Sequence, residues 1–103
     1  MSLPVIRLRA AREDIVEISI YLMEQNQDAA ERFLTMLQET LAALSEMPEM
    51  GIIYKLTDKI ELRRFRVRQF ENYLIFYQAL DDRLELVRVI YGTRDIPNLL
   101  EDL

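Results

Sequence analysis

The sequence of 103 residues contains no cysteine and no histidine. Without cysteine the chain can form neither a disulfide framework nor a thiolate metal site, which fits a reducing compartment. Without histidine it lacks the commonest general base and the commonest metal ligand, so most enzyme templates are excluded. Carboxylates, tyrosines, lysines and arginines remain for chemistry, and we expect neither a cofactor nor a metal ion.

Long apolar runs are also missing. No stretch of about 18 apolar residues could span a bilayer, and the N-terminus lacks the apolar stretch of a signal peptide. We therefore expect a cytoplasmic protein. Half of the residues are apolar and 30% are charged, a composition typical of one compact domain over residues 1–103.

The charge of the chain is unevenly distributed. The net charge is −5, yet residues 1–50 carry 4 basic and 9 acidic side chains, whereas residues 51–103 carry 9 of each. Six of the basic side chains fall between Lys55 and Arg68, against only Asp58 and Glu61. This basic band on an acidic molecule favours a partner with local negative charge.

Two helices are expected in the N-terminal half. Apolar residues recur at helical spacing from Ala11 onward and stop at a polar cluster. A second apolar stripe follows Asp28, which forms a capping box with Glu31, and it ends before Gly51. Because only residues 25–28 join the two stripes, we expect an antiparallel helical hairpin.

Strands are expected on both sides of this hairpin. Alternation over residues 4–9 predicts a short opening strand, and residues 60–67, 73–80 and 84–91 predict an antiparallel meander joined by short loops. Asp95 can cap a C-terminal helix of roughly eight residues. The order β-α-α-β-β-β-α indicates an α+β fold, with the hairpin packed on one face of the meander and a short helix at the C-terminus.

The predicted sheet is apolar on both faces. The strand over residues 73–80 is apolar at odd and even positions alike. In the last strand, alternation assigns Glu85, Val87, Val89 and Tyr91 to one face, and Leu84, Leu86, Arg88 and Ile90 to the other.

The helical hairpin can cover one of these faces, but a C-terminal helix about 12 Å long is too small to cover the second. We therefore expect an open apolar groove that receives an amphipathic helix or strand of a partner. There are two alternatives for this second face. A homodimer could bury it, or the C-terminal segment could fold back over it more completely.

Arginine is expected to line this groove. Arg64, Arg66 and Arg68 alternate with Phe65 and Val67, so the arginines face away from the core. Arginine outnumbers lysine 11 to 2, and its guanidinium suits bidentate contact with carboxylate or phosphate. A solvated charged face is the alternative. The expected partner-binding residues are Arg64, Arg66, Arg68, Leu86, Arg88, Ile90 and Arg94.

Four segments together resemble the ParE branch of the RelE/ParE toxin superfamily. They are the helix opening Ala11–Ile18, the exit at Pro48 and Gly51, the strand Tyr73–Tyr77 and the ending Val87–Asp95. The resemblance implies the toxin of a type II toxin–antitoxin module of the plasmid-stabilisation type. It also implies a ParD-like antitoxin whose C-terminal segment wraps onto the toxin.

Two activities occur in this superfamily, and the resemblance does not decide between them. RelE-like members cut messenger RNA on the ribosome, whereas ParE-like members are associated with inhibition of DNA gyrase and have no recognised hydrolytic site. RNA cleavage needs a proton acceptor, a proton donor and cations that stabilise the phosphorane. The candidate residues for that chemistry are Arg64, Arg66, Arg88 and Tyr91, with Glu71 as a further carboxylate in an expected turn.

The net charge opposes direct binding to RNA, since a charge of −5 repels phosphate. Tyr91 also stands where ParE relatives often show histidine. We therefore expect a toxin that binds a protein, which the resemblance suggests is DNA gyrase, and no sequence-specific contact with nucleic acid. A ribosome-dependent endonuclease and an inactive interaction module are the alternatives.

Overall fold

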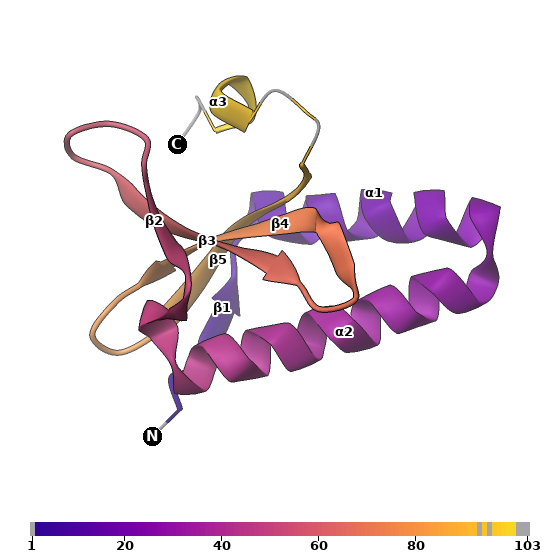
Figure 1. Ribbon diagram of the computed structural model, residues 1–103, viewed down its shortest axis with the longest axis horizontal. Helices are drawn as coiled ribbons and strands as arrows, with labels where there is room; N and C mark the ends of the chain where they lie inside the picture. Colours follow the sequence, from indigo (N-terminus) through magenta and orange to yellow (C-terminus); the bar gives the residue numbers. More distant parts are fainter. Residues whose placement is uncertain (1, 93, 95, 101–103) are drawn as a thin grey trace.

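A computed structural model provides the structure, which describes residues 2–92, 94 and 96–100. Two long helices form a hairpin that packs on one face of a sheet, and the C-terminal segment lies on the other side (Figure 1). The elements in chain order are β1 (Val5–Arg7), α1 (Arg9–Gln25), α2 (Gln27–Glu46), the 3-10 turn η1 (Pro48–Met50), β2 (Ile52–Lys55), β3 (Glu61–Val67), β4 (Phe70–Ala79), β5 (Leu84–Tyr91) and α3 (Ile96–Leu99).

The sheet has five strands in the order β1-β5-β4-β3-β2. β1 pairs with β5 in parallel, and the other neighbours pair antiparallel. The predicted α+β class, the meander and the helical hairpin are therefore confirmed. The strand β2 was not predicted, because four residues are too few to show an alternating pattern.

The junction between the helices is tighter than expected. A single residue, Asn26, joins α1 to α2, and its side-chain oxygen accepts a hydrogen bond from the backbone N–H of Asp28 at 2.9 Å. The N-cap of α2 is therefore Asn26. The predicted capping box, which placed the N-cap at Asp28, was wrong. The extended backbone of Asn26 leaves its side chain free to satisfy an N–H group of the first turn.

The two apolar faces of β4 are confirmed. Tyr73, Ile75 and Tyr77 belong to the core between the sheet and the helices, where Phe33 of α2 and Ile15 of α1 also lie. The intervening residues Leu74 and Phe76 of β4 belong to a second core on the opposite face. The sheet is therefore the middle layer of three.

The predicted faces of β5 were wrong, because this strand contains a β-bulge. Tyr77 pairs with Leu86 and Phe76 pairs with Arg88, so the register shifts at Val87. An extra residue in one strand reverses the alternation beyond it. Leu86 consequently lies in the core on the helix side, while Ile90 lies in the core on the opposite face.

The expected open groove on the second face was also wrong. Leu74, Phe76 and Ile90 are all buried there, and Leu100 of the C-terminal segment is completely buried against them. Further cover comes from partly buried residues of the β2–β3 region and of α3, namely Tyr54, Leu56, Ile60, Ile96 and Leu99.

The C-terminal segment therefore folds back, as the alternative had allowed, although α3 has four residues rather than eight. β2 and the loop that follows it supply the rest of the cover. The predicted helix cap at Asp95 lies outside the described residues.

Tyr77 fixes the connection between α2 and β2. Its ring is fully buried; its hydroxyl accepts a hydrogen bond from the Gly51 N–H at 2.9 Å and donates one to the Pro48 carbonyl at 2.7 Å. A Cβ atom at Gly51 would lie 2.5 Å from this hydroxyl oxygen, so glycine is required for the close approach. Burial raises the pKa of Tyr77, while the Gly51 hydrogen bond and Arg63 oppose that shift.

We expect Tyr77→Phe to lower the free energy of unfolding by about 1–3 kcal/mol, because two backbone groups lose their hydrogen-bond partner. Urea denaturation measures the change. Tyr54→Phe is the matched control, since the Tyr54 hydroxyl makes no hydrogen bond to the described residues. Equal losses in the two variants would refute the role assigned to the Tyr77 hydroxyl.

Candidate functional site: a groove beside the open edge of β3

Among the residues that the structure describes, no strand lies on the outer side of part of β3. β2 pairs only with Glu61–Arg64, so the remainder of β3 from Phe65 to Val67 forms a free edge. Between this edge and α2 lies a cavity of about 590 Å³, to which Met50 and Ile52 also contribute. We call it the β3 groove; its lining residues from α2, β3, β4 and the turn between these two strands are Glu39, Thr40, Ala43, Arg64, Phe65, Arg66, Val67, Arg68 and Glu71.

The main chain of Arg66 points into the β3 groove. At one end of the groove, the Arg68 N–H donates to the Thr40 hydroxyl at 3.0 Å, and that hydroxyl donates to the Met36 carbonyl at 2.6 Å. At the other end, Arg64 pairs with Ile52. Backbone groups of alternate strand residues point to the same edge, so Arg66 presents its N–H and C=O there. An unpaired edge of this kind can accept another strand.

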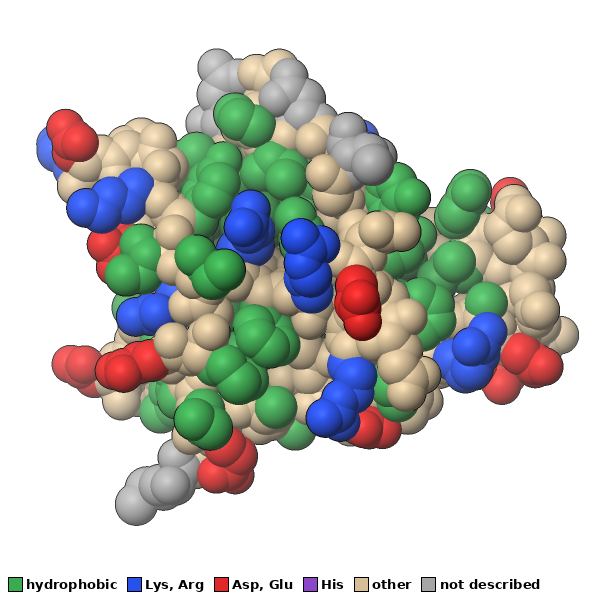
Figure 2. All heavy atoms as spheres, in the orientation of Figure 1, with side chains coloured by type: hydrophobic (Ala, Val, Ile, Leu, Met, Phe, Trp, Pro, Cys, Tyr) green, Lys and Arg blue, Asp and Glu red, His purple; other side chains and the backbone are tan. Residues whose placement is uncertain are grey.

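Arginine side chains surround this edge. Arg64 and Arg66 pair with Phe76 and Leu74 of β4 and therefore lie on the second face, opposite Phe65 and Val67. This confirms the predicted side for Arg64 and Arg66. The prediction was wrong for Arg68, which lies in the turn after β3 with its guanidinium beside Glu39 of α2, on the helix side of the sheet. Figure 2 shows basic side chains gathered over the middle of this face, among hydrophobic ones.

These guanidinium groups make few polar contacts with the other described residues. Arg66 Nη1 donates to the Glu71 carbonyl at 2.7 Å, and Arg68 Nη1 lies 3.6 Å from an oxygen of Glu39 in an exposed pair. Among the described residues, Arg64 has no ion-pair partner. The groove can therefore offer positive charge to a ligand.

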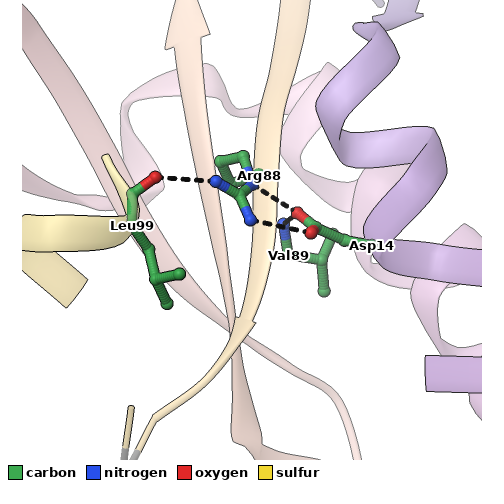
Figure 3. Close-up of polar contacts among 4 residues, drawn as sticks. All are labelled: Asp14, Arg88, Val89 and Leu99. Carbon is green, nitrogen blue, oxygen red and sulfur yellow. Dashed lines mark hydrogen bonds and ion pairs between the residues drawn. The ribbon is translucent and has the colours of Figure 1, made fainter. Parts of the chain in front are cut away.

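Arg88 has a different environment from the arginines of β3 (Figure 3). Its Nε and Nη2 atoms donate to the two carboxylate oxygens of Asp14 at 2.6 and 2.9 Å, and Nη1 donates to the Leu99 carbonyl at 2.7 Å. Asp14 also accepts the Val89 N–H at 3.0 Å. The hydrogen bond to Asp14 raises the pKa of Arg88, and desolvation opposes this shift. Arg88 thus joins α1, β5 and the C-terminal segment.

The structure separates the seven residues that were expected to bind a partner. Arg64, Arg66 and Arg68 come together in the β3 groove. Leu86 and Ile90 are buried in opposite cores, Arg88 is bound to Asp14, and Arg94 lies beside α1.

The residues considered for RNA cleavage do not converge either. Arg64 and Arg66 lie on the second face of β3, whereas Tyr91 packs against Tyr73, which belongs to the core on the helix side. Arg88 is held in its ion pair with Asp14. Glu71 lies in β4 rather than in a turn, because the turn contains only Arg68 and Gln69, the latter with a φ of 64°.

A family model described as the ParE toxin of the type II toxin–antitoxin system parDE matches residues 5–96. The chain belongs to the ParE toxin family. The match runs from the start of β1 to the first residue of α3. ParE toxins of parDE systems pair with a ParD antitoxin. A search of curated proteins finds no match to the chain.

Two buried polar residues that join separate elements of this ParE chain were not predicted from the sequence. Asp14 and Thr40 are polar residues on the buried stripes of α1 and α2. A buried carboxylate needs a cation or several N–H donors, so its position on an apolar stripe was a usable signal. The partner of that carboxylate could not be read from the same signal, because Arg88 is 74 residues away.

Neither a metal site nor a membrane span is found in the described part of this ParE chain. No three acidic side chains of residues 2–92, 94 and 96–100 are grouped so that they could hold a metal ion. Over the same residues, no helix has the length and apolar character needed to cross a membrane.

Proposed function

We propose that this ParE toxin acts by binding a protein, which the family resemblance suggests is DNA gyrase, and that a ParD-like antitoxin neutralises it at the β3 groove. The observation that carries the antitoxin site is the unpaired edge of β3 at Arg66, bordered by Arg64 and Arg68. Family membership supports the toxin–antitoxin relationship.

The groove suits an extended, acidic segment of the antitoxin. Such a segment can pair with the main chain of Arg66 as an additional strand. Its apolar side chains can contact Met50, Ile52 and Ala43, which line the groove. Its carboxylates can accept charge-assisted hydrogen bonds from Arg64, Arg66 and Arg68, which all line the groove. The site therefore binds the segment through main-chain hydrogen bonds, and its arginines favour a segment of negative charge.

Binding rather than catalysis is supported by the arrangement of the polar residues. The chain has no histidine, and the residues considered for RNA cleavage lie on different faces of the sheet. Arginine is a poor general base because its pKa is far above neutral. The Glu71 carboxylate lines the β3 groove with Arg64 and Arg66, but Tyr91, the other group considered for proton transfer, lies on the opposite side of the sheet.

The proposal predicts four results in a single series of experiments. Induction of the chain alone in bacteria should arrest growth, and co-expression of the ParD antitoxin should restore it. The purified toxin should inhibit supercoiling by DNA gyrase, and it should leave ribosome-bound messenger RNA intact. Cleavage of messenger RNA without gyrase inhibition would instead support the RelE-like activity. Unimpaired growth would support an inactive interaction module.

A further inference from the structure

The strand β2 forms one edge of the sheet, since it is the last strand in the order β1-β5-β4-β3-β2 (Figure 1). Its inner side pairs with β3, and no strand of the described residues lies on its outer side. Ile52 and Ile53 of this strand are 65% and 49% exposed. Proteins usually protect an exposed edge with proline, a bulge or several charges. β2 has neither proline nor bulge, and its one charged residue is Lys55, so this edge is suited to pair with a further strand.

The register of β2 shows which main-chain groups point outward. The Leu56 N–H donates to the Ile60 carbonyl at 3.0 Å, directly beyond the last residue pair of β2 and β3. Main-chain groups of alternate residues point to the same edge of a strand, so those of Tyr54 point to β3, as Leu56 does. Those of Ile53 and Lys55 consequently point away from the sheet, and they make no hydrogen bond to another described residue.

An antiparallel copy of the same strand fits this edge. When Ile53 of one chain lies opposite Lys55 of a second chain, the two residues exchange both of their main-chain hydrogen bonds. A two-fold axis between the chains repeats this pair, so every outward main-chain group of both strands gains a partner. A patch that is complementary to itself in this way is what a two-fold dimer requires.

The charges at the two ends of β2 favour the antiparallel orientation. Glu46 and Glu49 precede the strand, whereas Lys55 ends it and Lys59 lies in the loop that follows. These side chains are exposed and have no ion-pair partner among the described residues. An antiparallel copy brings its basic end beside the acidic end of the first chain, and the two-fold axis repeats this contact. A parallel copy would bring like charges together.

We propose that the free toxin forms a two-fold dimer in which the β2 strands of two copies pair antiparallel and join the two sheets into one. The exposed Ile52 and Ile53 then lie at the contact between the copies. The antitoxin proposal concerns the free part of β3, whereas this dimer uses the outer edge of β2, although Ile52 borders both. The dimer is tested without antitoxin, so its failure leaves the antitoxin proposal unaffected.

Sedimentation velocity of the full chain measures the self-association. The average mass should rise from that of the monomer toward that of the dimer as the protein concentration increases. Ile53→Lys should weaken the association by at least about tenfold, because it places a lysine directly opposite Lys55 of the second copy. Ile20→Lys is the matched control, since Ile20 is 53% exposed but lies on α1; this variant should associate as the unmodified chain does.

Hydrogen exchange of the unmodified chain shows whether the main chain of β2 takes part. Exchange at the amides of Ile53 and Lys55 should slow by at least about tenfold at high protein concentration, because both gain a hydrogen bond in the dimer. The amide of Tyr54 already points to β3 and should change little with concentration. This measurement does not depend on whether any variant folds.

A charge reversal tests the orientation of the two strands. Glu49 lies four residues before Ile53, and Lys59 lies four residues after Lys55, so the proposed register places them at the same end of the interface. Glu49→Lys should weaken the dimer by about threefold, as expected for exposed charge pairs. Adding Lys59→Glu should restore the affinity, because it recreates opposite charges.

Any of four outcomes would overturn the proposal. The chain would remain monomeric at every concentration, or Ile53→Lys and Ile20→Lys would weaken the association equally. Unchanged exchange at Ile53 and Lys55 in a dimeric sample would place the interface elsewhere. A Lys59→Glu change that fails to restore the affinity of Glu49→Lys would contradict the antiparallel pairing.

Discussion

Asp14→Ala should lower the free energy of unfolding by about 3–5 kcal/mol, the usual cost of removing one partner from a buried ion pair. The Asp14 carboxylate accepts two hydrogen bonds from Arg88 and one from the Val89 N–H. Its removal would leave a largely buried guanidinium without a counterion and a buried N–H without an acceptor. The loss should weaken the attachment of both α1 and the C-terminal segment to β5.

Chemical denaturation of Asp14→Ala and Glu13→Ala provides the comparison. Glu13 is the neighbouring residue on α1, and its pair with Arg9 is 3.8 Å long and largely exposed. We expect Glu13→Ala to change stability by less than about 0.5 kcal/mol. Adding Arg88→Met to Asp14→Ala should recover part of the loss, since the unpaired charge is then absent. A small change in the free energy of unfolding of Asp14→Ala would show that the ion pair contributes little to stability.

Reversing the charge of Arg64 and Arg66 together should weaken binding of the ParD antitoxin by at least about 100-fold. Removing charged hydrogen-bond donors from an interface typically costs 2–5 kcal/mol, and about 1.4 kcal/mol corresponds to a factor of ten. Two introduced glutamates would also repel an acidic segment. Isothermal titration calorimetry measures the affinity, and circular dichroism should be unchanged because neither arginine is in the core.

The control for this variant reverses two arginines elsewhere. Arg7 and Arg12 are exposed, lie outside the β3 groove and have no ion-pair partner among the described residues. Arg7→Glu with Arg12→Glu changes the net charge by the same amount, so any long-range electrostatic effect is matched. If both double variants lose the same affinity, the antitoxin does not contact the β3 groove specifically.

Much of the fold could be predicted because its signals are local. The two helices follow from apolar residues at helical spacing, and the meander follows from short runs of β-branched and aromatic residues. The two-faced character of β4 was visible in the residues Tyr73–Tyr77. These features depend on neighbouring residues alone, so the sequence pattern contains them.

The features that sequence analysis missed depend on residues far apart in the chain. The bulge at Val87 is fixed by pairing between β4 and β5, and it moves Leu86 to the opposite face from Ile90. The short strand β2 is recognisable only through its pairing with β3. Without these two features, the second face seemed open, although β2 and Leu100 help to cover it.

The candidate site was predicted in part for the same reason. The alternation of Arg64 and Arg66 is local and placed them correctly on one side of β3, whereas Arg68 lies in the turn after β3 and contacts Glu39 of α2. The free edge beside them arises because β2 ends its pairing at Arg64, which no local pattern indicates. Thr40, which closes one end of the groove, is 28 residues from its partner Arg68.

Hydrogen exchange at the backbone N–H of Arg66, measured with and without the ParD antitoxin, is the most direct test of this account. If the antitoxin adds a strand to β3, exchange of this amide should slow by at least about tenfold in the complex, since the edge gains a main-chain hydrogen bond. Unchanged exchange at Arg66, together with protection confined to α1, would contradict the account.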